Sequence, residues 1–146
     1  MIALIQRVSE ARVEVEGGTA GAIGTGILAL VAIEPGDGPV QVERMAERLA
    51  GYRIFADEAG RMNRSLRDIG GGLLLVSQFT LAADTKKGMR PSFSQAADPE
   101  EARAIFDTLL TACRQRLPRV ETGVFGAHMR VYLVNDGPVS FILNVR

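Results

Sequence analysis

The pattern of apolar and polar residues predicts three strands at the start of the chain. Residues 2–8 are mostly apolar, and residues 11–16 alternate between apolar and charged side chains, which is typical of a half-exposed strand. The segment 17–26 contains five glycines, and another apolar run follows over residues 27–33. A phosphate-binding glycine loop is followed by a helix. Because a strand is predicted here, we interpret the glycines as tight turns.

Two segments have the apolar periodicity of amphipathic helices. Pro39 suits the first turn of one helix, and Gly51 marks its end. Asp98 can cap the other helix, and Pro118 ends it. The apolar positions are Val42, Met45, Ala46, Leu49 and Ala50 in the first helix, and Ala102, Ile105, Phe106, Leu109, Leu110 and Cys113 in the second. Both helices are predicted to pack on a sheet.

A buried strand in the middle of the chain ends in polar residues. The apolar run 73–76 follows a glycine cluster and is itself followed by Ser77-Gln78-Phe79-Thr80-Leu81. The end of a central strand can aim hydrogen-bond donors at a substrate, although a strand simply leaving the core explains the same residues. The next segment, 82–97, has no periodic pattern and includes Lys86, Lys87 and Arg90. This loop is either a solvated surface or a contact for an anionic ligand such as a nucleic-acid backbone.

The remaining segments complete a prediction of the fold. Residues 52–55, 120–124, 129–134 and 139–145 are predicted strands, and residues 57–70 are a polar loop. Asn135-Asp136-Gly137-Pro138 between the last two strands is a hairpin signal, or a stiff loop whose carbonyls point elsewhere. The order of elements predicts a single α+β domain over residues 1–146. It has a curved, mainly antiparallel, barrel-like sheet with two packed helices.

Composition narrows the classes of function. The 146 residues include 17 basic and 17 acidic side chains, a balance that argues against broad nonspecific nucleic-acid binding but not against a local basic patch. The single cysteine, Cys113, suits a reducing cytosol, and with one histidine it cannot form the usual metal cluster. We find neither the pattern of a signal peptide nor an apolar run of bilayer length. We therefore expect a cytoplasmic protein without a membrane partner.

No conventional set of catalytic side chains is evident. The sequence shows no clear Ser-His-Asp set, carboxylate pair or metal cluster. His128 begins a predicted strand, where a lone histidine is more often a surface residue than a base. Cys113 lies on an apolar helix stripe with no base nearby in sequence, which predicts core packing rather than a nucleophile. An enzyme with this sequence would rely on backbone donors and on positioning of its substrate.

Three motifs occur in order along the chain: Ser77-Gln78-Phe79-Thr80-Leu81, Gly88-Met89-Arg90-Pro91-Ser92-Phe93 and Asn135-Asp136-Gly137-Pro138-Val139. Together with Ile5-Gln6-Arg7-Val8 and Gly51-Tyr52-Arg53-Ile54-Phe55, they resemble the D-aminoacyl-tRNA deacylase family, also called D-tyrosyl-tRNA deacylase. The resemblance covers the whole chain. It implies a cytoplasmic homodimer without a cofactor, which hydrolyses the ester between a D-amino acid, or glycine, and the 3′-terminal adenosine of tRNA.

The resemblance also implies roles for individual residues. Those that line the ester are Ser77, Gln78, Phe79 and Thr80, with the main-chain amides of the last two facing the carbonyl oxygen. Gly137-Pro138 is similar to a cis Gly-Pro element that enters the partner subunit's pocket and rejects the L-substrate. Phe125 and Met129 match positions in the pocket wall, and Arg7 matches a residue that supports the Gly-Pro loop. His128 departs from the family pattern, which often has an acidic residue there.

Three accounts of function follow. In the favoured one, the 2′-hydroxyl of the terminal ribose helps to activate water, because Thr80 has no base nearby and is a poor nucleophile. A general esterase would instead use Thr80 as nucleophile and pass through an acyl-enzyme. A noncatalytic RNA-binding or adaptor domain would use Lys86, Lys87 and Arg90 and leave the other motifs without a role. We expect tRNA, and not DNA, as the nucleic-acid partner.

Overall fold

The two longest strands run side by side and define one half of the sheet. In the computed structural model, which describes residues 1–146, β1 (Ile2–Val15) and β8 (Arg130–Asn144) pair antiparallel along almost their whole length. On its other edge, β1 pairs with β3 (Gly26–Ala32) over its first half and with β2 (Gly18–Ile23) over its second. The strands predicted over residues 2–8 and 11–16 are therefore one strand.

The other half of the sheet is built around β6 (Gly72–Ser77), which lies between β3 and β7 (Val120–Thr122) and is parallel to both. The strand order is β2-β1-β3-β6-β7, with β8 paired to β1. The sheet curves until β2 approaches β7, where a Cβ on Gly21 would collide with the carbonyl of Thr122. Glycine permits this approach. The predicted α+β class with a curved, mainly antiparallel sheet is confirmed.

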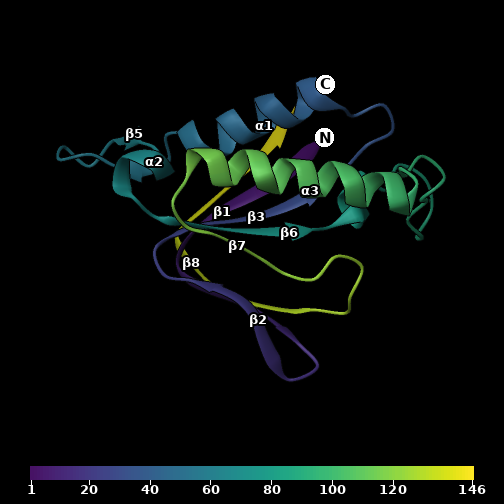
Figure 1. Cartoon of the computed structure of the whole chain (residues 1–146), viewed down its shortest axis with the longest axis horizontal. Coiled ribbons are helices and arrows are strands. Elements are labelled where there is room, and N and C mark those ends of the chain that lie inside the picture. Colours follow the sequence, from purple (N-terminus) through teal and green to yellow (C-terminus); the bar gives the residue numbers. More distant parts are fainter.

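The two predicted helices, α1 (Pro39–Gly51) and α3 (Pro99–Arg116), lie on the same face of the sheet (Figure 1). The five apolar residues predicted to face the core from α1 are all buried, and those of α3 are buried or packed against the same core. Asp98 caps α3, because its Oδ2 accepts the N–H groups of Glu100 and Glu101 at 3.1 and 3.3 Å. The helix prediction is confirmed.

Short elements occupy the segment that was predicted to be a polar loop. These are β5 (Met62–Arg64) and the one-turn helix α2 (Leu66–Ile69). β5 pairs with β4 (Phe55–Ala56), so the strand predicted over residues 52–55 forms only at its last residue. A capping box explains α2: Ser65 Oγ accepts Asp68 N–H at 3.1 Å, and Ser65 N–H donates to Asp68 Oδ2 at 2.8 Å. The predicted loop over 57–70 was therefore wrong in part, since local hydrogen bonding folds a segment with little apolar periodicity.

The predicted hairpin near the C-terminus was also wrong. Residues on both sides of Asn135-Asp136-Gly137-Pro138 belong to β8 and pair with β1 in the same direction, with register shifts opposite residues 6–10. Asn135 closes this excursion: its Oδ1 accepts Val139 N–H at 3.0 Å, and its Nδ2 donates to Ser140 Oγ at 3.0 Å. The turn residues therefore produce a break within one strand and do not reverse the chain.

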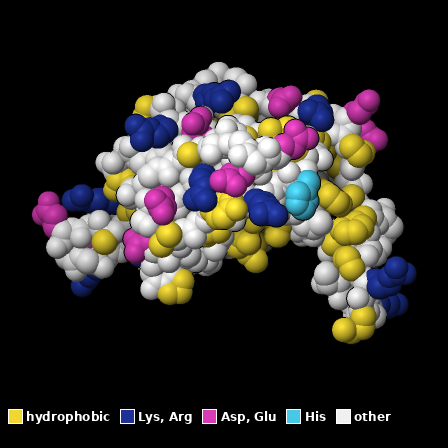
Figure 2. Space-filling view, turned by 90° about the horizontal axis from the view of Figure 1, so that it is seen from below, with side chains coloured by type: hydrophobic (Ala, Val, Ile, Leu, Met, Phe, Trp, Pro, Cys, Tyr) yellow, Lys and Arg dark blue, Asp and Glu magenta, His cyan; other side chains and the backbone are white.

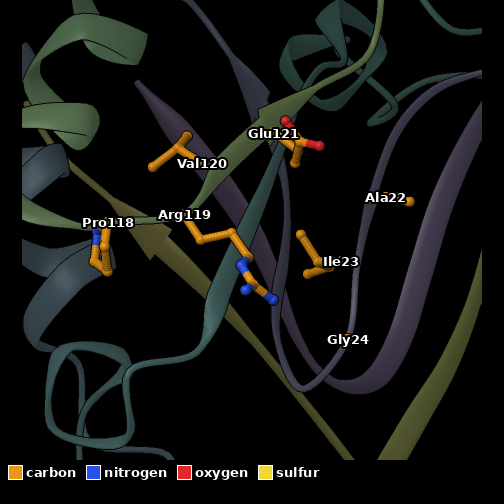
Figure 3. Close-up of a pocket in the computed structure, with 7 residues that line it drawn as sticks. All are labelled: Ala22, Ile23, Gly24, Pro118, Arg119, Val120 and Glu121. Carbon is orange, nitrogen blue, oxygen red and sulfur yellow. The ribbon is translucent and has the colours of Figure 1, made fainter.

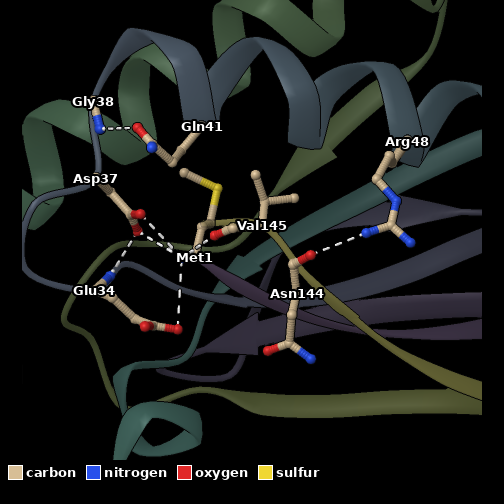
Figure 4. Close-up of polar contacts among 8 residues, drawn as sticks. All are labelled: Met1, Glu34, Asp37, Gly38, Gln41, Arg48, Asn144 and Val145. Carbon is tan, nitrogen blue, oxygen red and sulfur yellow. Dashed lines mark hydrogen bonds and ion pairs between the residues drawn. The ribbon is translucent and has the colours of Figure 1, made fainter.

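Polar contacts join the beginning of β1 to the end of β8 (Figure 4). The ammonium group of Met1 donates to Asp37 Oδ1 at 3.0 Å and to the carbonyl of Val145 at 2.9 Å, and it lies 3.5 Å from Glu34 Oε1. The side chain of Met1 is fully buried. The loop before α1 and both termini are thereby fixed to one another.

Candidate active site

The polar residues after the central strand form a tight turn at the edge of the sheet. All apolar residues of β6 are buried, and the strand ends at Ser77. Gln78 N–H still donates to the carbonyl of Val31 at 2.8 Å, so the sheet fixes the chain up to that residue. The predicted strand end is therefore a rigid base for the residues that follow.

The next residues form the 3₁₀ helix η1 (Phe79–Ala82). Leu81 N–H donates to the carbonyl of Gln78 at 3.3 Å and so makes the first hydrogen bond of the turn. The amides of Phe79 and Thr80 precede this hydrogen bond, so the turn itself does not use them. Gln78 Nε2 donates to Thr80 Oγ1 and fixes the threonine side chain.

A cavity of about 710 Å³ lies beside this turn, a size typical of small-molecule sites. Its lining residues are Val76, Ser77, Gln78, Phe79, Phe93, Ala96, Ala97, Asp98, Pro99, Ala102, Phe125, Gly126, Ala127, His128, Met129 and Val131. Five residues singled out from the sequence meet here: Ser77, Gln78, Phe79, Phe125 and Met129. Thr80 does not line the cavity.

Aromatic side chains form much of the cavity wall. Phe79 is 58% exposed and packs against Phe93, with ring centroids 5.2 Å apart. Phe125 packs against Phe106 at 6.0 Å and anchors the opposite wall to α3. Figure 2 shows the only histidine, His128, at the edge of a group of hydrophobic side chains. The cavity thus combines apolar surface with the polar end of β6, as ligand sites commonly do.

The cavity also contains three residue types of the serine hydrolase triad, but they are not assembled. Ser77, Asp98 and His128 all line it, and no hydrogen bond joins any two of them. Asp98 instead accepts the first amides of α3. The arrangement favours chemistry by backbone donors and positioning over a side-chain base.

The loop with Gly137-Pro138 lies outside this cavity. Arg7 holds it: its Nε donates to the carbonyl of Asp136 at 3.0 Å, and its Nη1 donates to the carbonyl of Ile54 at 2.8 Å. The peptide bond between Gly137 and Pro138 is cis, and both residues are exposed. The structure thus places Arg7 beside the loop and brings neither loop residue into the cavity of its own chain.

The predicted cationic loop is exposed and is pinned at its base by two hydrogen bonds between the backbones of Asp84 and Ser92. No ion pair involves Lys86, Lys87 or Arg90. None of the three lines the cavity, although Phe93 at the end of this loop does. The structure therefore brings the end of this loop to the cavity, while its three cations lie outside the lining.

A second hollow, of about 470 Å³, lies between β2 and the start of β7 (Figure 3). It is lined by seven residues, and the side chain of Arg119 extends across it toward Ile23. It contains none of the residues singled out from the sequence and only one acidic side chain, Glu121. The cavity beside β6 is the better candidate for an active site.

Other groups that could carry chemistry are accounted for by the fold. Cys113 is fully buried, and burial raises the pKa of its thiol to about 12, against an opposing effect of the nearby Arg116 charge. This agrees with the prediction of core packing. No group of three or more His, Cys, Asp or Glu side chains is placed to hold a metal ion. None of the helices has the length and apolar character needed to cross a bilayer.

Several cavity residues were not singled out from the sequence. Phe93, the segment 96–99, Ala102, Gly126 and Ala127 are among the lining residues. Phe93 ends one of the three motifs, and Asp98 begins a predicted helix, but neither pattern indicates which cavity the residue faces. Only the packing of α3 across the sheet brings them to the end of β6.

Fold and cavity together define a one-domain α+β protein with a largely apolar cavity at the end of a buried strand. A family model described as D-Tyr-tRNA(Tyr) deacylase matches residues 4–144. The D-aminoacyl-tRNA deacylase of Methylococcus capsulatus is 68% identical over 143 residues, covering 98% of this chain and 94% of the relative. That of Stenotrophomonas maltophilia is 67% identical over 144 residues, covering 98% and 99%. This chain belongs to the D-Tyr-tRNA(Tyr) deacylase family.

Solved structures agree with the fold. The c-Myc DNA Unwinding Element Binding Protein superposes with a TM-score of 0.95 at 37% identity, covering 100% of this chain and 99% of the other. A structure described as a probable eukaryotic D-amino acid tRNA deacylase gives a TM-score of 0.85 at 16% identity, covering 99% and 98%. The second likeness concerns the fold alone.

Proposed function

We propose that this protein hydrolyses the ester bond of D-aminoacyl-tRNA, with glycyl-tRNA as a further substrate. One observation carries the proposal: a single cavity brings the polar end of β6 together with Phe125 and Met129. The relatives of highest identity given above are named D-aminoacyl-tRNA deacylase, which supports the same reaction. The cavity holds the 3′-terminal aminoacyl-adenosine.

The reaction needs a water molecule, an activated carbonyl and a proton for the leaving oxygen. The amides of Phe79 and Thr80 donate to the carbonyl oxygen and stabilise the negative charge that develops there. Water adds to the carbonyl carbon with help from the neighbouring 2′-hydroxyl. The bond to the 3′-oxygen then breaks, and that oxygen takes a proton. The absence of a paired base beside Thr80 favours this route over attack by its hydroxyl.

The proposal includes a homodimer in which Gly137-Pro138 of one subunit enters the cavity of the other. The loop is exposed, fixed by Arg7 and outside the cavity of its own chain. β8 pairs on one edge only, and large apolar side chains on it are exposed: Tyr132, Val134, Phe141 and Ile142. An unpaired strand edge of this length, with apolar side chains exposed on the strand, is a typical docking surface.

Chiral selection follows from the stiffness of that loop. A deacylase must refuse the abundant L-aminoacyl-tRNA, and specificity of this kind often needs a built-in clash. Main-chain atoms of a fixed loop cannot rotate away from an L side chain, whereas glycine allows the backbone to approach the substrate closely. The same loop would hold the ammonium group of the substrate with its carbonyls.

Lys86, Lys87 and Arg90 would contact the phosphates of the tRNA backbone. The protein would carry out this reaction in the cytoplasm.

Incubation with D-tyrosyl-tRNA and L-tyrosyl-tRNA tests the proposed function. We expect release of D-tyrosine and retention of the L ester. An RNA-binding or adaptor domain would leave both esters intact, and a general esterase would cleave both and also cleave simple esters without tRNA. Either result would contradict the proposal. The oligomeric state is measured by sedimentation, where a monomer would contradict the two-subunit site.

A further inference from the structure

Arg103 is a cation next to two cavity residues, although it does not itself line the cavity, and the sequence did not single it out. It follows the cavity residue Ala102 in the first turns of α3. Its guanidinium carbon lies 4.7 Å from the ring centroid of Phe125, another cavity residue. This is within the distance of a cation–π contact. A positive charge is therefore held against one of the aromatic walls of the site.

No ion pair with a neighbouring residue of α3 holds the Arg103 side chain in this position. Glu100 and Asp107 are three and four residues away on α3, where carboxylates commonly pair with an arginine. No ion pair involves Arg103, whereas Arg116 on the same helix pairs with Glu43. The Arg103 side chain is exposed and lies over Phe125. Its edge N–H groups are thus available to an anion.

We propose that Arg103 is a substrate-binding residue for the phosphodiester group that joins the terminal adenosine of tRNA to the preceding nucleotide. The inference rests on the proposed function, in which the cavity holds that adenosine. An arginine can stack one face on an aromatic ring and donate from its edge to phosphate oxygens, which a lysine cannot do. The lining itself includes no lysine or arginine, and its one carboxylate, Asp98, accepts two helix amides.

Two small substrates isolate this contact: 3′-O-D-tyrosyl-adenosine and the same compound with a 5′-phosphate. We expect the unaltered protein to have a lower KM for the phosphorylated compound by about five-fold, equivalent to about 1 kcal/mol for an exposed charge contact, with an equal kcat. Arg103→Ala should remove that preference, so that the KM values for the two compounds become equal. Arg103→Lys should retain part of the preference.

Arg114→Ala is the matched control, because Arg114 is an exposed arginine on α3 that stacks on no aromatic ring. It should keep the full preference for phosphate. Equal hydrolysis of both compounds by the unaltered protein, or a preference retained by Arg103→Ala, would overturn the phosphate contact alone. An equal loss on both compounds would mean that Arg103 only supports Phe125, which also overturns it. No hydrolysis of either compound or of D-tyrosyl-tRNA would overturn the proposed function as well.

Discussion

Two strands of the sheet are interrupted by polar or turn residues, and the surroundings of the two breaks differ. The first break is residues 77–81 at the end of β6, and the second is residues 135–138 inside β8. The turn after Ser77 borders a largely apolar cavity of its own chain. The excursion at Gly137-Pro138 is exposed and is held from behind by Arg7 and Asn135. One break borders a cavity, and the other presents exposed residues that line no cavity of their own chain. In our proposal, the two meet across a subunit boundary.

Disturbing the loop break should have the largest effect on activity. Gly137 has a φ of 141°, and a Cβ there would collide with Val139 and approach Arg7 Nη2 at 3.2 Å. Gly137→Val should therefore displace the loop and reduce kcat/KM for D-tyrosyl-tRNA about 100-fold, as misplacement near reacting groups can do. Gly60→Val is the control, because Gly60 also has a positive φ but nothing within 4 Å. Comparable losses in both variants would mean that strain alone is responsible.

A smaller effect is expected at the first break. Thr80 does not line the cavity and accepts a hydrogen bond from Gln78. Thr80→Ala should lower the single-turnover deacylation rate by less than about 10-fold, because only the orientation of the turn is affected. Removing a true nucleophile costs about 10⁶ in rate. A loss of that size, or a trapped acyl-enzyme in the unaltered protein, would contradict substrate-assisted attack by water.

The smallest effect is expected at the exposed cations, which belong to neither break. Replacing Lys86 and Lys87 together by alanine should raise KM for tRNA. It should also reduce the slope of log KM against log salt concentration by about 0.7–0.9 for each lost phosphate contact. The double variant Arg44→Ala with Arg114→Ala removes the same charge elsewhere. If both double variants shift the slope equally, Lys86 and Lys87 act only through net charge.

The first break could be predicted from the sequence and the second only in part. An apolar run followed by Ser77-Gln78-Phe79-Thr80-Leu81 locates a buried strand and its polar end, because a short run of apolar residues indicates a buried strand. Asn135-Asp136-Gly137-Pro138 has the composition of a hairpin, but pairing of β8 with β1 on both sides overrides that local signal. The cavity wall from α3, and the position of Arg103 beside it, depend on how a helix crosses the sheet, which local pattern does not determine.

The most direct test of a site shared between subunits is a heterodimer of two variants that each have strongly reduced activity. One variant is Gly137→Val, which alters the loop, and the other is Ala96→Trp, which fills the cavity from its half-buried wall. If each site combines one subunit's cavity with the other's loop, the heterodimer contains one site with both parts unaltered. The two variants are co-expressed with different affinity tags, the heterodimer is purified through both tags, and hydrolysis of D-tyrosyl-tRNA is measured. We expect about half the activity of the unaltered dimer, since one of two sites is restored. A heterodimer as inactive as its parents would contradict the shared site.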